Sequence, residues 1–236
     1  LRPHTILELA ASEGIELPGG APLNDASDLG AWFAEKADSG SLVDCLKTFD
    51  VTLSVMQTAE GLSRVAREFV EDLVVDGVVY GEIRWAPEQH CDKGLSLEQA
   101  VDAVQSGLDE AVATAKAAGK AIRVGQLITA MRHNDRGMEI AQLALAYRDR
   151  GCVGFDIAGA EAGFPPSRFA DAFTHLAENM FPVTVHAGEA DGVESIRSAL
   201  VDGRTLRLGH GVRIGEDIGD LSAHDAEVAG LGGQVL

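Results

Sequence analysis

The chain has 236 residues, of which 46% are hydrophobic and only 5% aromatic, so aliphatic side chains must fill a sizeable core. Its 37 acidic and 19 basic residues give a formal net charge of −18. Because phosphate contacts need a basic face, and because no apolar run reaches the ~20 residues of a membrane span, we expect neither a nucleic-acid nor a membrane partner.

The three cysteines, Cys45, Cys91 and Cys152, are far apart and show no CxxC spacing. This usage argues against a disulfide framework and fits a reducing cytoplasm. The first residues carry no pattern of a secretion signal. We therefore expect a soluble cytoplasmic protein. Because the chain begins at Leu1 rather than Met, we also expect it to be part of a longer polypeptide.

The first 76 residues have helical periodicity. Apolar residues recur at helix spacing in four segments, at 5–14, 28–37, 41–49 and 59–77. A Pro- and Gly-rich loop at 17–27 interrupts them. The pattern predicts an N-terminal segment made of helices alone.

Beyond Val78 the pattern changes to alternating strands and helices. Strands are predicted at 78–87, 121–130, 152–159, 181–188 and 205–211, and helices at about 96–118, 135–150, 167–178 and 192–201, with another beginning near Ser222. Strands that alternate with amphipathic helices predict right-handed crossovers and a parallel sheet.

The strands favour a closed barrel over an open doubly wound sheet. Polar residues recur on one face of several strands, for example Glu82 with Arg84 and Thr184 with His186. An open sheet buries both faces and rarely carries this many polar residues, whereas a barrel displays such residues inside and at its mouth. We predict an α/β fold, an incomplete (β/α)8 TIM barrel with about five parallel strands, and a buried ion pair between Glu82 and Arg84.

Two strand ends carry the candidate chemistry. His186 ends one predicted strand in the run HAGE, and Glu189 follows three residues later. A strand-end imidazole with a nearby carboxylic acid suits a metal ligand and a proton carrier. The alternative is that His186 caps the strand and Glu189 begins the next helix. His210, between two glycines in LGHG, ends the next strand, and the two histidines would converge at a barrel mouth.

Other candidates have weaker patterns. Gly159, in the glycine-rich turn after the strand at 152–159, could offer its backbone N–H to a ligand. His90 follows another strand and is placed at the mouth. The remaining histidines, at positions 4, 133, 175 and 224, have polar or helical surroundings typical of surface residues.

Four motifs in this order resemble the adenosine deaminase family: VYGEIRWAPEQH, GFDIAGAE, VTVHAGEADGVESI and RLGHGVRIGEDI. The resemblance runs over nearly the whole chain, and the combination of HAGE with GHG is specific. It implies that residues 1–76 form a helical cap segment between barrel strands 1 and 2. Residues 77–236 would carry strands 2 to 6 with their helices, in one structural domain overall.

The resemblance also implies a function. The family hydrolyses adenosine, and 2′-deoxyadenosine, to inosine and ammonia in purine salvage with one Zn²⁺ ion. His186 would be a zinc ligand, Glu189 the proton donor to the purine ring, and His210 the residue that orients or deprotonates the water on zinc. Gly159 would bind the purine nucleoside, a small-molecule substrate, through its backbone. Glu189 must then carry a proton in the substrate complex.

The chain departs from the family in its metal ligands. The family's His-x-His pair and its late Ser-Leu-Asn-Thr-Asp-Asp-like run are both absent from the sequence. Because a catalytic zinc site uses about three protein ligands, we expect this chain alone to bind zinc weakly and to be inactive. Two alternatives stay open: an adenine or other aminopurine deaminase of the same superfamily, and a non-catalytic barrel remnant that acts as a binding module.

Overall fold

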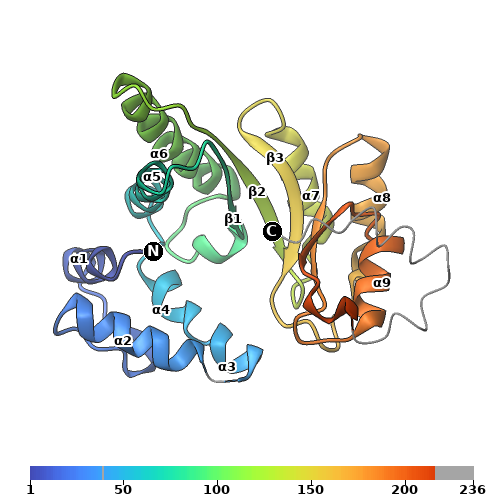
Figure 1. Ribbon diagram of the computed structural model, residues 1–236, viewed down its shortest axis with the longest axis horizontal. Coiled ribbons are helices and arrows are strands. Elements are labelled where there is room, and N and C mark those ends of the chain that lie inside the picture. Colours follow the sequence, from blue (N-terminus) through green and yellow to red (C-terminus); the bar gives the residue numbers. More distant parts are fainter. Residues whose placement is uncertain (39, 216–236) are drawn as a thin grey trace. The chain divides into compact units, whose positions relative to one another are not determined.

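Helices and strands alternate from β1 (Tyr80–Trp85) onward, as the sequence predicts (Figure 1). The computed structural model describes residues 1–38 and 40–215. The helices are α1 (Pro3–Glu13), α2 (Ala26–Ala37), α3 (Leu42–Leu46), α4 (Phe49–Ser54), α5 (Ala59–Val75), α6 (Leu97–Ala117), α7 (Gly137–Ala146), α8 (Ala170–Glu178) and α9 (Val193–Val201). The helix predicted near Ser222 lies outside the described residues.

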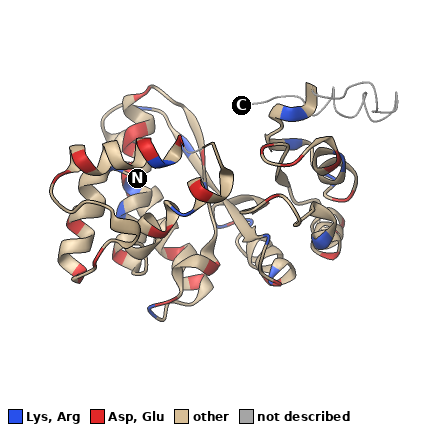
Figure 2. Cartoon of the chain, turned by 90° about the horizontal axis from the view of Figure 1, so that it is seen from below, with Lys and Arg blue, Asp and Glu red and all other residues tan. Residues whose placement is uncertain are grey.

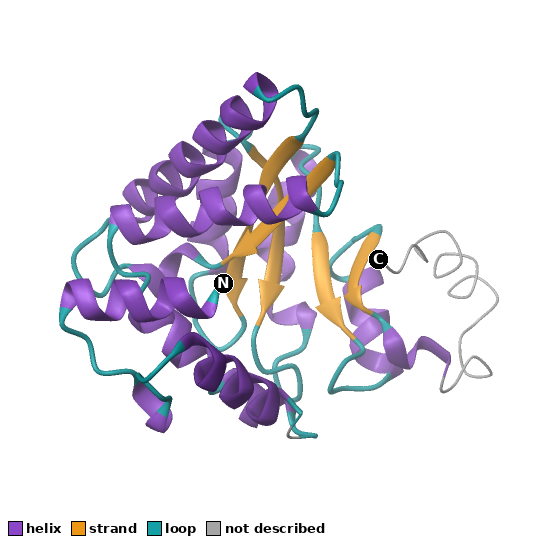
Figure 3. Ribbon diagram, turned by 60° about the vertical axis from the view of Figure 1, so that its left-hand side comes forward, coloured by secondary structure: helices purple, strands orange, loops and turns teal. Residues whose placement is uncertain are grey.

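Five strands form two parallel sheets. They are β1 (Tyr80–Trp85), β2 (Arg123–Met131), β3 (Cys152–Ala158), β4 (Thr184–Ala187) and β5 (Arg207–His210). The first three form one sheet in the order β1-β2-β3, and β4 pairs with β5. A parallel bridge between Phe155 and Val183 links the two sheets. Within each sheet the arrows point the same way (Figure 3), which confirms the predicted parallel strands.

Contacts divide the chain into two units. Unit 1 comprises Leu1–Ile83 and Pro87–Gly125, and unit 2 comprises Arg84–Ala86 with the chain from Gln126 onward. The division expected from the family resemblance, at 76/77, concerns the place of each segment in a complete barrel, and it stays a prediction.

Unit 1 is built mostly of helices whose ends are encoded locally. Helix α1 begins at Pro3 and is capped after Glu13 by Gly14, which has a φ of +64° that suits glycine. Helix α6 begins with a capping box in which Ser96 and Gln99 satisfy each other's backbone N–H groups. Helices α5 and α6 approach so closely that a Cβ on Gly107 would lie 2.0 Å from the carbonyl oxygen of Ser63. Small residues are therefore needed where these helices cross.

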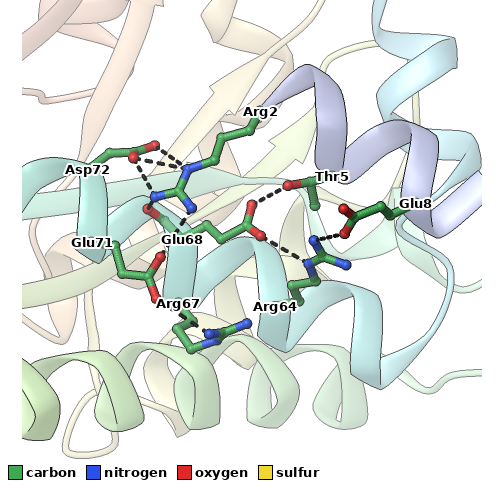
Figure 4. A network of polar contacts seen from close by, with 8 residues as sticks. All are labelled: Arg2, Thr5, Glu8, Arg64, Arg67, Glu68, Glu71 and Asp72. Atoms are coloured by element: carbon green, nitrogen blue, oxygen red, sulfur yellow. Dashed lines mark hydrogen bonds and ion pairs between the residues drawn. The ribbon is translucent and has the colours of Figure 1, made fainter. Parts of the chain in front are cut away.

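A polar network joins α1 to α5 within unit 1 (Figure 4). The buried carboxylate of Glu68 accepts a hydrogen bond from the Thr5 hydroxyl at 2.6 Å and one from Arg64 Nε at 2.9 Å. Arg2 forms ion pairs with Glu71 at 3.1 Å and with Asp72 at 2.5 Å. Burial raises the pKa of Glu68, but its bonds to Thr5 and Arg64 outweigh that effect and leave the pKa below its usual value.

Unit 2 holds the carboxyl ends of β2 to β5. Ile128, Phe155 and Val185 on consecutive strands are completely buried, as expected of parallel strands covered by helices. In the register of β4 and β5, His186 lies opposite Gly209 and Ala187 opposite His210. The strand ends that carry the candidate chemistry therefore lie next to each other.

The helices carry many acidic residues, in keeping with the net charge of −18 of the sequence. Figure 2 shows acidic residues on the helices of unit 1 with Lys and Arg between them. In the described part of the chain, no helix has both the length and the apolar character that crossing a membrane requires.

Candidate active site

The buried carboxylate of Asp156 holds the ring of His186. Asp156, on β3, is 0% exposed, and its Oδ2 lies 2.8 Å from His186 Nδ1. Its Oδ1 accepts hydrogen bonds from the backbone N–H of Ile157 at 2.7 Å and of His186 at 3.3 Å. Although Oδ2 and Nδ1 are close, they are not aligned as a hydrogen bond. Charge and proximity therefore hold the ring more than directed bonding does.

Arg84 identifies which nitrogen of His186 carries the lone pair. Its Nη1 lies 3.3 Å from His186 Nε2. A guanidinium has only donors, so Nε2 must accept, and a neutral His186 then carries its proton on Nδ1, facing Asp156. The Nε2 lone pair thus faces a cation in the structure. A carboxylate beside Nδ1 is the usual partner of a histidine that ligates a metal through Nε2.

The predicted ion pair between Glu82 and Arg84 is not the one that the structure forms. Arg84 Nε lies 3.0 Å from Asp156 Oδ2, and Glu82 accepts a hydrogen bond from the Tyr80 hydroxyl at 2.8 Å. The two-residue spacing places Glu82 and Arg84 on the same face of the strand. However, the Asp156 carboxylate is completely buried, so it depends on a neighbouring positive charge more than the partly exposed Glu82 does. Side chains of alternate strands meet inside a barrel, as those of β1 and β3 do here.

His210 and Glu189 form an acid-base pair beside this ring. His210 Nε2 lies 3.3 Å from Glu189 Oε2, and both side chains are 38% exposed. The ring centroids of His186 and His210 are 5.2 Å apart. The structure therefore brings together the three predicted residues His186, Glu189 and His210. A small molecule placed against them would meet an imidazole lone pair, a carboxyl group and a second imidazole.

The backbone around His210 is unusual. His210 has a φ of +69°, a value that non-glycine residues rarely adopt, and Gly211 follows with +64°. Next to it, a Cβ on Gly209 would lie 3.1 Å from His186 Cγ. The two glycines of LGHG thus have separate uses: Gly209 leaves room for the His186 ring, and Gly211 continues the left-handed turn that follows β5.

Gly159 lies just beyond the carboxyl end of β3, with a φ of +105°. A Cβ on it would lie 3.1 Å from Met131 Cε and 3.6 Å from His133 Nδ1. These neighbours of Gly159 lie at or just beyond the end of β2. Neither of them is His186 or His210. It precedes Glu161 by two residues, and Glu161 binds the loop that carries Glu189.

Three charged residues of this site were not singled out as functional by the sequence: Asp156, Glu161 and Arg132. Arg132 is completely buried, donates to the carbonyl oxygen of Phe164 at 2.6 Å and also donates to that of His186. Burial lowers the pKa of Arg132, while the charges of Glu161 and Asp156 act against that effect. The signal that could have found them is the presence of ionisable residues inside or next to apolar strands, because such residues need partners.

The contacts of His186, Glu189 and His210 given above involve no other histidine. His90, placed at the mouth by the sequence, is 3% exposed in unit 1, and its Nδ1 donates to the carbonyl oxygen of Met56 at 2.8 Å. Burial lowers the pKa of His90, so a neutral structural role fits it. His4 and His133 are exposed, as expected, and His175 is half-buried. His224 lies outside the described residues.

In the described part of the chain, no group of three His, Cys, Asp or Glu side chains is arranged to hold a metal ion. Among the residues that the structure describes, His186 fits one such ligand, because its Nδ1 lies beside the buried carboxylate of Asp156 and its Nε2 is an acceptor. The described residues thus supply one candidate ligand of a metal site.

Comparison with known proteins gives consistent matches. A family model described as adenosine deaminase matches residues 1–228. Among curated relatives, "Adenosine deaminase 1" of Streptomyces coelicolor is 56% identical over 218 residues, which cover 92% of this chain and 54% of that protein. The chain therefore spans about half the length of this relative.

Solved structures match as well. An adenine deaminase from Arthrobacter aurescens is 29% identical, with a TM-score of 0.76 over 92% of this chain and 63% of that chain. A cog1816 amidohydrolase from Burkholderia ambifaria, solved with bound Zn, is 23% identical, with a TM-score of 0.79 over 96% of this chain and 59% of that chain, and shows the fold alone. These matches and the parallel strands confirm the predicted α/β fold with part of a (β/α) barrel.

Proposed function

This chain belongs to the adenosine deaminase family, and from that premise we propose that the protein containing it deaminates adenosine and 2′-deoxyadenosine hydrolytically. The reaction takes up one water and releases ammonia, leaving inosine or its 2′-deoxy form. The observation that carries the proposal is the group formed by His186, Glu189 and His210 at the ends of β4 and β5. The 56% identity to a curated adenosine deaminase supports it over most of the chain.

We assign His186 as one ligand of a Zn²⁺ ion through Nε2, oriented by Asp156. When bound, zinc would lower the pKa of a water molecule to about 7, so that hydroxide is available at neutral pH. A catalytic zinc site uses about three protein ligands, and the family's other ligand motifs are absent from this sequence. We therefore assign the remaining ligands to parts of the protein outside this chain.

Glu189 and His210 are assigned the proton transfers. Glu189 would hold a proton and donate it to a ring nitrogen of the purine, which makes the amino-bearing carbon accept a nucleophile more easily. His210, 3.3 Å away, would orient the attacking water and take its proton. Gly159 would hold the purine through its backbone N–H.

A second candidate is supported by one structural match. The adenine deaminase from Arthrobacter aurescens shares 29% of residues, so an aminopurine base without ribose is the alternative substrate. A non-catalytic binding module is the third reading, and it would account for the missing ligand motifs. The identity to the curated adenosine deaminase favours adenosine over both. A role in purine salvage in the cytoplasm, with small-molecule partners only, follows from the same proposal.

The test is a substrate panel with the whole protein that contains this chain, loaded with zinc. Adenosine, 2′-deoxyadenosine and adenine are each incubated with it, and inosine, 2′-deoxyinosine, hypoxanthine and ammonia are quantified. We expect both nucleosides to turn over, and a Glu189→Gln variant to keep only a small, measurable part of that turnover. Faster conversion of adenine would support the second candidate. Absence of turnover in protein that retains stoichiometric zinc would support a binding module.

A further inference from the structure

The buried carboxylate of Glu161 accepts hydrogen bonds from the loop between β4 and α9. Glu161 is 4% exposed and follows β3. Its oxygens accept from Gly188 N at 2.5 Å, Glu189 N at 3.0 Å, Ala190 N at 2.7 Å, Asp191 N at 3.0 Å and Ser195 Oγ at 2.6 Å. Four consecutive backbone N–H groups and a hydroxyl therefore converge on one side chain.

This arrangement requires a carboxylate. Every group that faces the two Glu161 oxygens in these contacts is a donor, and an ionised carboxylate is an acceptor only. An amide in its place would direct an NH2 group against N–H donors. Burial raises the pKa of Glu161, but the bonds from Ser195 and from the backbone outweigh that effect and hold the pKa below its usual value. The buried guanidinium of Arg132 adds a favourable charge.

The loop that Glu161 holds is the one that carries Glu189. Gly188 has a φ of +74°, and a Cβ on it would lie 2.5 Å from Ile196 Cδ1, so the loop passes close to α9. The backbone of Glu189 is fixed by its own N–H and by those of its neighbours on both sides. Its side chain is left partly exposed, 3.3 Å from His210.

We propose that Glu161 is a positioning residue, which fixes the backbone of residues 188–191 so that the Glu189 carboxyl group meets the purine ring. This inference rests on the proposed function for the role of Glu189. It also makes a claim about the loop alone, which can be tested without any substrate. The competing explanation is that Glu161 only stabilises the start of α9, in which case its loss would cost stability but would not act through Glu189.

The first experiment measures the loop. Amide hydrogen exchange is compared between the whole protein and its Glu161→Gln variant. The matched control is Glu68→Gln, because Glu68 is also buried and hydrogen-bonded but lies in unit 1. We expect the amides of residues 188–191 to exchange at least about tenfold faster in Glu161→Gln and not in the control. Unchanged exchange at 188–191 would overturn the proposal.

The second experiment measures the coupling to Glu189 through the rate of adenosine deamination. We expect Glu161→Gln to lower kcat by about 10- to 100-fold and to change KM by less than about threefold. In the Glu189→Gln background, the further loss should be less than about threefold, because the group that Glu161 positions is already gone. An equal loss in both backgrounds would show that Glu161 acts independently of Glu189, and the proposal would fail.

Two milder variants, both at Ser195, test the proposal if Glu161→Gln does not fold. Ser195→Ala removes one of the five donors, and Ser195→Thr keeps the hydroxyl. We expect Ser195→Ala to lower kcat by about two- to fivefold and Ser195→Thr to restore it. Equal kcat in both would count against the proposal. If the unsubstituted protein does not convert adenosine, the proposed function fails, while hydrogen exchange in Glu161→Gln and Ser195→Ala still decides whether the carboxylate holds the loop.

Discussion

The Oδ2 atom of Asp156 lies 2.8 Å from Nδ1 of His186, and its carboxylate is completely buried. In the proposed function this contact orients the ring of His186, and Nε2, which faces Arg84 in the structure, is the proposed metal ligand. Removing the charge of Asp156 should therefore weaken the binding of zinc by His186 without removing the imidazole itself.

We predict that Asp156→Asn raises the Kd for zinc in the whole protein by about 10- to 100-fold, as expected when the orienting partner of a histidine ligand is lost. Competition with a chelator of known affinity measures this change. Asp171→Asn on α8 is the control, because Asp171 is exposed and should leave zinc binding unchanged. Equal zinc retention in the two variants would refute the role of Asp156.

Arg132 leads to a prediction about stability. The charge of its buried guanidinium favours the buried carboxylates of Glu161 and Asp156, so Arg132→Leu would leave those carboxylates with less compensating charge and remove two bonds to backbone carbonyls. We expect this variant to lower the free energy of unfolding of the whole protein by about 3–5 kcal/mol. Urea unfolding measures it, with Arg197→Leu on the exposed face of α9 as the control. A loss below about 0.5 kcal/mol, typical of surface substitutions, would contradict the prediction.

The sequence predicted the elements of this fold better than the partners of its charged residues. The strands were predictable because apolar runs end at glycines, and the group formed by His186, Glu189 and His210 was predictable because these residues follow neighbouring strand ends. The partner of Arg84 was not, because Asp156 comes from another strand and only the folded chain brings them together. Glu161 has no spacing rule at all: its donors are backbone groups, which are the same in every sequence.

The network of Figure 4 predicts a pH dependence in unit 1. Thr5→Val removes the hydroxyl that donates to Glu68 at 2.6 Å, and a hydrogen bond to a charged group is worth about 1.5–3 kcal/mol. Because the pKa of Glu68 is lower in the folded than in the unfolded protein, this contribution is fully present above the unfolded value of about 4.3. It is lost as the pH falls through the folded value.

Urea unfolding of the whole protein and of Thr5→Val at a series of pH values tests this. The difference in free energy between them should be constant above about pH 5 and shrink below about pH 4. Effects of pH on other groups are common to both proteins and cancel in the difference. Thr114→Val, at an exposed position on α6, serves as the control for replacing a threonine by valine. A difference that grows as the pH falls would contradict the assignment.

Cys152 should be chemically inert in the folded protein. It is buried at the start of β3, and burial raises its pKa to about 11, so almost no thiolate exists near neutral pH. We expect iodoacetamide at pH 8 to label the half-buried Cys45 and Cys91 at least about 100-fold faster than Cys152. Mass spectrometry of peptides from native and urea-unfolded protein measures the rates. Native labelling of Cys152 at the rate of Cys91 would contradict the burial.

The left-handed backbone of His210 predicts that stability and activity respond differently to substitution there. At a φ of +69°, Asn is tolerated and a β-branched residue is not. We expect His210→Asn to keep the free energy of unfolding within about 0.5 kcal/mol and His210→Val to lose about 1–3 kcal/mol. Leu206→Val, at an exposed position without positive φ, is the control for the effect of valine itself.

Both His210 variants should lose deamination of adenosine, because neither side chain can take a proton from water. The variant with Asn is the informative one, since its loss of activity cannot be attributed to a loss of folding. Urea unfolding and adenosine turnover measured on the same preparations test both halves. Equal stability of the two variants would show that the backbone at 210 is not held left-handed, and an active His210→Asn would remove His210 from the proposed proton transfer.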